Sequence, residues 1–159
     1  MGNCIKPLAG DLIRPLIAPP TINKSFNSSE VYNIIRQATN CDTIILYDSV
    51  YDAIDTADVK RFLVSNINND YVTDAYDCDN FTFAIVARVH DWAYKRKNRS
   101  GGLCFGILAG DLRLQETDPE RPHAVGFFID SNKKLCLVDG MYNEILELQP
   151  WMRVWNVIV

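Results

Sequence analysis

The stretch that decides the fold is residues 76–97, YDCDNFTFAIVARVHDWAYKRK. From Asp79 to about Lys97, its apolar residues recur at helical spacing and would surround most of the surface of a helix. A helix that is apolar nearly all round belongs in the interior of a domain rather than on its surface. We therefore expect a central buried helix against which the other elements pack.

Cys78 stands at the first turn of this expected helix. The positive end of the helix dipole and the unpaired backbone N–H groups there favour the thiolate, which is the nucleophilic form of cysteine. Asp77 and Asp79 flank the thiol, and their negative charge works against that form. With Asn80 they also supply hard oxygen donors that would suit a calcium ion, although their spacing does not match an EF-hand loop.

Outward from this stretch, the chain predicts helices before it and strands after it. Residues 1–27 hold four of the seven prolines and predict an extended arm, which leaves 28–159 as one domain. Helices are expected over about 29–39 and from Asp55 or Thr56, with a short β-rich run at 43–47. The later β-rich runs are 103–109, 124–129, 135–138, 145–148 and 154–159. Helices followed by strands with hairpin-length links predict an α+β fold, with the central helix on a C-terminal antiparallel sheet.

Two of these runs are expected to form a hairpin. A tight turn at Ser131-Asn132 would pair the run that His123 opens with the run that Asp139 ends. Counting back from the turn places His123 opposite Gly140 or Met141, so Asp139 becomes its near neighbour. The length of the turn is critical, because a slip of one residue moves every side chain to the other face.

Cys78, His123 and Asp139 would then supply a nucleophile, a general base and an orienting acid. Such a set predicts a cysteine hydrolase, a peptidase or amidase, that acts on a protein or peptide through an acyl-enzyme; passing the acyl group to an amine would use the same site. His90 is excluded as the base, because it lies about 18 Å along the helix axis from Cys78. The structural alternatives are an ordinary cysteine, a surface histidine and a turn-forming Asp139-Gly140 pair.

Composition excludes several classes of function. The net charge of −4 and the pI near 5.1 argue against a nucleic-acid binder, and the basic cluster at 95–99 is interpreted as a solvated helix C-terminus. No apolar run approaches the roughly 18 residues of a spanning helix. The five cysteines lack CxxC spacing and no secretory signal precedes them, which favours a cytoplasmic protein.

The run at 76–81, the alanine-rich helix after it, the strand at 102–110, the His123-Ala124 pair and the hairpin ending at Asp139 together resemble a known family. This family comprises the lectin-related cysteine protease domains, typified by the papain-like domain at the C-terminus of the Marasmius oreades agglutinin and also found as stand-alone bacterial and phage proteins. The resemblance covers about residues 70–159. It implies a papain-like fold, the Cys78, His123 and Asp139 triad, and calcium contacts among Asp77, Asp79 and Asn80.

The chain departs from that family in two ways. Asp139-Gly140-Met141 stands where the family has Glu-Pro-Gln, so the acid is shorter and a glutamine is missing. The β-trefoil sugar-binding domain is absent, so glycan recognition does not carry over from the resemblance. Met141 in place of the glutamine supports a second hypothesis, in which the chain is a catalytically inactive papain-like binding or accessory module, such as a viral protein could be. The sequence does not indicate an oligomeric state.

Overall fold

The computed structural model describes residues 17–65, 77–96, 98–113 and 115–159. Within these ranges the chain forms nine strands and three helices. The helices are α1 (Ser28–Thr39), α2 (Thr56–Ser65) and α3 (Cys78–Tyr94). The strands are β1 (Ser25–Asn27), β2 (Thr43–Ile45), β3 (Val50–Asp52), β4 (Gly102–Leu103), β5 (Phe105–Asp111), β6 (Pro122–Ile129), β7 (Leu135–Asp139), β8 (Glu144–Leu146) and β9 (Arg153–Ile158).

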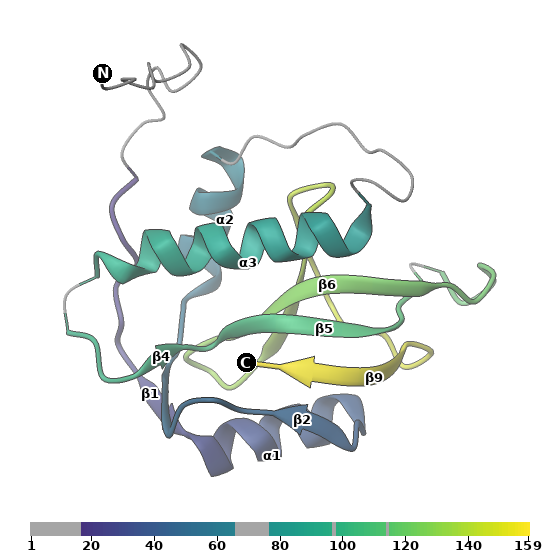
Figure 1. Cartoon of the computed structure of the whole chain (residues 1–159), viewed down its shortest axis with the longest axis horizontal. Coiled ribbons are helices and arrows are strands. Elements are labelled where there is room, and N and C mark those ends of the chain that lie inside the picture. Colours follow the sequence, from purple (N-terminus) through teal and green to yellow (C-terminus); the bar gives the residue numbers. More distant parts are fainter. Residues whose placement is uncertain (1–16, 66–76, 97, 114) are drawn as a thin grey trace, which may run out of the picture.

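A six-stranded sheet with the order β2-β9-β5-β6-β7-β8 forms the centre of the molecule. Its strands pair antiparallel except β2, which runs parallel to β9. A second, small sheet has the order β1-β3-β4. Helix α3 lies along β5 and β6 on one face of the main sheet, and α1 lies on the opposite side, below β2 (Figure 1).

The strands bury side chains on both faces, which explains why several of them are apolar throughout. In β6, Phe127 belongs to the core beneath α1, whereas its neighbour Phe128 belongs to the core beneath α2 and α3. Successive side chains of a strand point to opposite faces, so both residues are removed from water. Ile85 and Val89 of α3 are at most 1% exposed in the second core, whereas Phe83 and Tyr94 of the same helix are 59% and 66% exposed. The prediction of a helix buried nearly all round is therefore wrong, and α3 buries only the face that packs on the sheet.

Capping groups set where two of the helices begin. At α1, the Asn27 side chain accepts a hydrogen bond from the Glu30 N–H at 2.9 Å, and the Glu30 carboxylate accepts one from the Asn27 N–H at 3.1 Å. This capping box satisfies two backbone donors of the first turn, and the helix begins at Ser28, one residue before the expected start at about residue 29. At α3, the Asn80 side chain accepts from the Asp77 N–H at 3.3 Å, and the helix begins at Cys78 as predicted.

The order of the elements corrects the predicted fold class. Helices do not simply precede a C-terminal antiparallel sheet, because β1, β2 and β3 all come before α2 and α3. The parallel pairing of β2 with β9 also makes the main sheet mixed rather than antiparallel. Strands β1 and β3 are three residues long and are held by partners distant in sequence, so their own residues show no periodicity. The β-rich runs after residue 100 do form strands.

Some of the predicted segments lie outside the described residues. These parts are positions 1–16 of the expected arm, the end of the expected helix at Lys97, and the stretch from 66 to 76 before Cys78. Residues 25–27, which were predicted to belong to the arm, form β1.

Cys41, Cys78, Cys104 and Cys136 are free thiols, and burial raises the pKa of Cys104 to about 12. No helix in the described ranges is long and apolar enough to cross a membrane.

A buried ion pair connects the small sheet to the end of α3. Both Arg96 Nη2 and Arg96 Nε donate to Asp52 Oδ2, at 3.0 and 3.2 Å, and the two side chains are 5% and 0% exposed. Asp52 Oδ1 also accepts from the Ser25 hydroxyl at 2.7 Å. The interpretation of the basic cluster as a solvated helix end is therefore wrong for Arg96, whose charge is held inside the protein.

Replacing Arg96 with methionine should destabilise the fold strongly. The change leaves the Asp52 carboxylate buried without its cation, which typically costs about 3–5 kcal/mol of the free energy of unfolding. Arg61→Met is the matched control, because Arg61 pairs with Asp58 at 2.7 Å from a half-exposed position on α2 and should cost at most about 1 kcal/mol. Urea unfolding followed by circular dichroism measures both, and similar losses in the two variants would contradict the assigned role of the buried pair.

Candidate functional site

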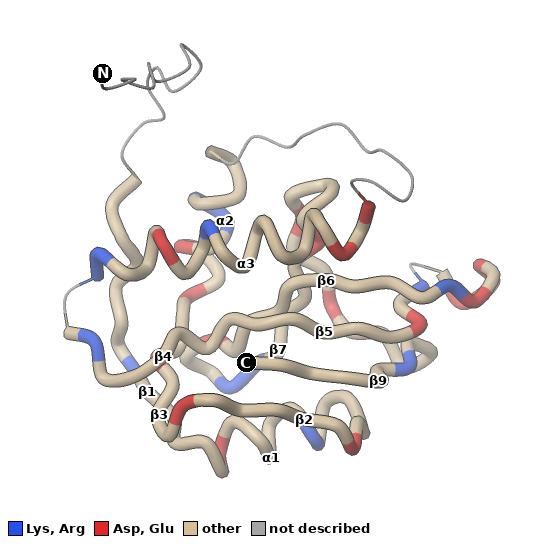
Figure 2. Tube along the Cα trace, in the orientation of Figure 1, with Lys and Arg blue, Asp and Glu red and all other residues tan. Residues whose placement is uncertain are grey.

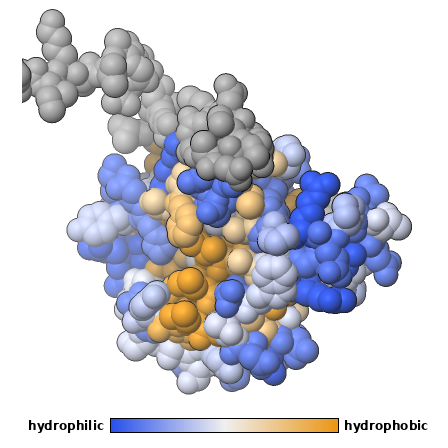
Figure 3. Space-filling model, turned by 45° about the vertical axis from the view of Figure 1, so that its right-hand side comes forward, coloured by the Kyte–Doolittle hydropathy of each residue, from blue (hydrophilic) through white to orange (hydrophobic). Residues whose placement is uncertain are grey.

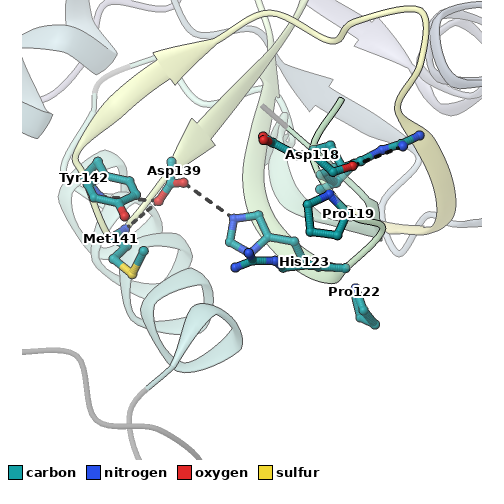
Figure 4. A pocket seen from close by; sticks show the side chains of 10 residues that line it. Asp118, Pro119, Pro122, His123, Asp139, Met141 and Tyr142 are labelled. Atoms are coloured by element: carbon teal, nitrogen blue, oxygen red, sulfur yellow. Dashed lines mark hydrogen bonds and ion pairs between the residues drawn. The ribbon is translucent and has the colours of Figure 1, made fainter. Parts of the chain in front are cut away.

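The β6–β7 hairpin brings His123 and Asp139 together. Gly126 pairs with Val138 and Ile129 with Leu135, so continuing the same register places His123 opposite Met141, as the counting predicts. His123 Nε2 lies 3.5 Å from Asp139 Oδ2 (Figure 4). The structure thus confirms the expected register and the expected contact between these two side chains.

Several donors stabilise the ionised form of Asp139. Its side chain is 5% exposed, and burial by itself raises the pKa of a carboxyl group. The contact with His123 and the hydrogen bonds from the Met141 and Tyr142 N–H groups, at 2.8 and 3.3 Å, outweigh burial and leave the pKa of Asp139 below its usual value. Asp139 therefore both orders the turn after β7 and holds the imidazole.

A cavity of about 260 Å³ opens in front of this pair (Figure 4). It lies between the β6–β7 side of the sheet and the loop that connects β5 to β6. Its wall combines charged groups with the apolar surfaces of two prolines, a methionine and a tyrosine. The lining residues are Leu112, Arg113, Asp118, Pro119, Arg121, Pro122, His123, Asp139, Met141 and Tyr142.

Arg113 holds the loop on one side of this cavity in place. Its Nη1 donates to the carbonyl oxygens of Glu116 and Asp118, both at 3.3 Å, and its Nε lies 3.3 Å from Asp111 Oδ2. The indole N–H of Trp151 donates to the Arg113 carbonyl at 3.2 Å. Because its guanidinium is committed to these contacts, Arg113 shapes the wall rather than offering its charge to a ligand.

Arg121 differs from Arg113 in this respect. It is exposed at the cavity, and its backbone N–H donates to Asp111 Oδ1 at 3.3 Å. Its guanidinium forms no hydrogen bond or ion pair with the residues that the structure describes. The cavity therefore carries one cationic group that is available to a ligand, beside the His123 imidazole.

The start of α3 packs against the same two strands. The Thr82 hydroxyl donates to the Ala124 carbonyl at 2.8 Å. A Cβ atom on Gly140 would lie 2.8 Å from the Phe81 carbonyl oxygen, so only glycine allows the helix to approach the β7 turn this closely. Cys78 is the half-buried first residue of α3 and is not among the residues that line the cavity. Its joining with His123 and Asp139 in one site stays a prediction.

The expected metal ligands lie at the beginning of α3. Asn80 accepts from the Asp77 N–H, and Asp79 Oδ1 accepts from the Asn80 N–H at 2.9 Å, so these oxygens take part in the helix start. Over the ranges described, no group of three or more His, Cys, Asp or Glu side chains is placed to hold a metal ion. Asp74, a further oxygen donor in the sequence, lies outside those ranges, and calcium at Asp77, Asp79 and Asn80 stays a prediction.

Sequence reasoning missed four polar or aromatic residues of the cavity, namely Arg113, Asp118, Arg121 and Tyr142. The loop that carries the first three has no recognisable motif, and only the pairing of β5 with β6 brings it beside His123. Gly110 pairs with His123, and Asp111 with Pro122, so the loop must begin and end next to the histidine. Predicting from the sequence that β5 and β6 form a hairpin would have placed this loop beside His123.

Comparisons with known proteins give a consistent result. A family model described as "Agglutinin C-terminal" matches residues 47–145. A structure described as "PSL1a-E64 complex" is similar with a TM-score of 0.71 and 14% identity, over 85% of this chain and 51% of that chain. A structure of Polyporus squamosus lectin bound to the human-type influenza-binding epitope Neu5Aca2-6Galb1-4GlcNAc is similar with a TM-score of 0.66 and 15% identity, over 85% of this chain and 49% of that one.

The chain thus spans about half the length of these fungal lectin chains. Among curated proteins no match is found. The family and the structural neighbours correct two predictions made from the sequence. The fold is of the agglutinin and lectin type, with nine strands and three helices in the described ranges, and not papain-like. The predicted cysteine hydrolase with a catalytic triad, acting on a protein or peptide, is also wrong, because the matching family and the structural neighbours are those of agglutinins and lectins.

The contribution of Asp139 to stability should depend on pH in a defined direction. A carboxyl group whose pKa is lowered by folding stabilises the protein above its ordinary pKa, and this contribution is lost as the pH falls through the folded value. The difference in free energy of unfolding between the parent and Asp139→Asn should therefore be constant above about pH 5 and decrease below the ordinary value of 3.8. Urea unfolding from pH 7 to 3 measures it, and a difference that grows on acidification would contradict the assigned contacts.

Proposed function

The chain belongs to the Agglutinin C-terminal family, and from this premise we propose that it is a non-catalytic binding module whose cavity at His123 and Asp139 holds a saccharide. The observation that carries the proposal is the cavity itself, in which an imidazole held by a carboxylate and an uncommitted guanidinium stand beside apolar rings. This proposal takes up the binding-module alternative of the sequence analysis and assigns it a partner of defined chemistry.

The lining suits a sugar because it offers two kinds of surface together. A pyranose ring has hydroxyl groups at its rim and C–H groups on its faces. Pro119 and Pro122 present apolar faces, and Tyr142, which is 61% exposed, adds an aromatic ring with a polar hydroxyl. Mostly apolar surface with a few fixed polar groups is the general character of small-ligand sites.

Charge narrows the class of sugar to one that carries a carboxylate. Arg121 provides a guanidinium with the fork geometry that matches a carboxylate in a bidentate pair. The nearest acids are occupied: Asp139 accepts from His123 and the turn, and Asp118 Oδ2 accepts from the Gln115 N–H at 3.1 Å. An acidic ligand therefore meets a cation, while the carboxylates beside it are engaged in the protein's own contacts.

The epitope in one structural neighbour ends in Neu5Ac, an acidic sugar. That neighbouring chain is about twice as long as the part this chain matches, so the likeness supports a saccharide as ligand without assigning the epitope to either half. A titration with this chain alone decides whether the matched half binds it.

Isothermal titration calorimetry with Neu5Acα2-6Galβ1-4GlcNAc should detect binding to the full chain. Arg121→Gln removes the guanidinium that pairs with the carboxylate and should weaken binding about tenfold, because a charge-assisted hydrogen bond contributes about 1.5–3 kcal/mol. The neutral disaccharide Galβ1-4GlcNAc should show a loss of similar size with the parent chain. The Cys78→Ser variant should bind the trisaccharide with the same affinity as the parent chain, since Cys78 does not line the cavity. The sugar should remain intact after the titration.

Arg61→Gln is the matched control for charge. Arg61 lies on α2, which Figure 1 places away from the ends of β5 and β6 where the cavity opens, and its loss should leave the affinity unchanged. Equal affinities for Arg121→Gln and the parent, or no heat of binding from either sugar, would overturn the proposal. An affinity that falls as much in Arg61→Gln would show a general effect of net charge instead.

A further inference from the structure

Strand β2 lies at one edge of the six-stranded sheet, and among the described strands it has a neighbour, β9, on one side only (Figure 1). The Ile45 carbonyl accepts from the Val159 N–H at 3.0 Å, and the Tyr47 N–H donates to the Val159 carbonyl at 3.3 Å. Backbone groups of alternate residues in a strand point to opposite sides, so those of Ile44 and Leu46 point away from β9. No described strand pairs with that outer side, which leaves a row of donors and acceptors open to a further strand.

The side chains of β2 line hollows on both faces of this edge. On the face that carries α3, Ile45 borders an apolar hollow of about 300 Å³ together with Phe83 of α3 and Ile158 of β9. These three side chains are 42%, 59% and 37% exposed. Apolar side chains gather visibly on one face of the molecule in Figure 3.

On the opposite face, Ile44 and Leu46 border a wider groove of about 540 Å³. Its other wall comes from the first turns of α1, including Tyr32 and Asn33, and Asp48 also lines it. This groove is therefore mainly polar, whereas the hollow around Ile45 is apolar. An added strand would place its own alternate side chains beside these two different surfaces.

We propose that the outer edge of β2 binds an extended peptide segment of a partner protein as an additional strand of the main sheet. The segment is a ligand rather than a substrate, and its binding is independent of the saccharide proposal. Main-chain hydrogen bonds to Ile44 and Leu46 provide the affinity, and the two hollows select side chains that alternate between apolar and hydrogen-bonding types.

Charge favours a basic partner over a second copy of this chain. Asp42 and Asp48 flank β2, the Asp42 side chain is 88% exposed although it pairs with Arg36 at 2.8 Å, and Asp48 is also exposed. Figure 2 shows acidic positions at both ends of the strand. Two β2 strands paired antiparallel about Ile45 would place Asp42 of each copy opposite Asp48 of the other, and like charges directly opposed are destabilising. Lysine or arginine at the ends of a partner segment would be attracted instead.

Fluorescence anisotropy with the full chain tests this inference. The probe is a labelled peptide of sequence Lys-Val-Thr-Ile-Thr-Val-Lys, and the matched ligand control has the same side chains but N-methyl groups on alternate backbone nitrogens. We expect saturable binding of the first peptide and at least a tenfold loss for the N-methylated one, since it can no longer donate along the strand edge. This comparison needs no change in the protein, so a folding defect cannot imitate the result.

Protein variants test the charge and the occupant. Asp42→Lys should weaken binding of the basic peptide about fivefold. The matched control is Asp91→Lys, on the exposed side of α3, which should leave the affinity unchanged. Equal binding of both peptides would overturn the inference. A dimer in sedimentation velocity would also overturn the inference if Ile45→Lys dissociates it, because a second copy of the chain would then occupy the edge.

Discussion

The packing of α3 across β5 and β6 is the contact on which the rest of the structure depends. The helix contributes Ile85 and Val89 to a core that it shares with Phe128 and Val138 of the sheet. At its first turns the helix comes so close to the β7 turn that Gly140 has no room for a side chain. This contact fixes the end of the β6–β7 hairpin relative to the helix, and with it the positions of His123 and Asp139.

The proposed binding cavity follows from this arrangement together with the loop between β5 and β6. The hairpin provides a buried carboxylate that orients the imidazole, and the loop provides the opposite wall, held by Arg113 through its backbone partners. Side chains committed to internal contacts form the frame of the cavity, while Arg121 and Tyr142 remain exposed within it. A preformed frame with few uncommitted groups is what selective binding of a small polar ligand requires.

Strand β2 leaves one edge of the main sheet without a described partner strand. At β2, short length and flanking acids limit pairing with identical strands. The same features leave an edge that a complementary basic segment can use. The cavity lies beyond the ends of β5 and β6, whereas the β2 edge lies alongside β9 (Figure 1), so the two proposed sites can be tested separately.

Local residue patterns were sufficient to predict a long helix that starts at Cys78, the later strands, and the hairpin register that joins His123 to Asp139. Each of these depends on periodicity, on a cap or on a tight turn, which are contained in neighbouring residues. The same patterns led to a wrong assignment of fold type and activity, because a cysteine, a histidine and an acid in a plausible order do not specify the architecture that surrounds them.

The sequence by itself therefore determined the elements with strong local signals and the pairing within one hairpin. Only the tertiary structure decided the places of β1 and β3, the burial of Arg96 against Asp52, and the meeting of the β5–β6 loop with His123. These features depend on contacts between residues far apart in the chain, whose energies are realised only when the whole sheet has formed. No local pattern of residues encodes such contacts.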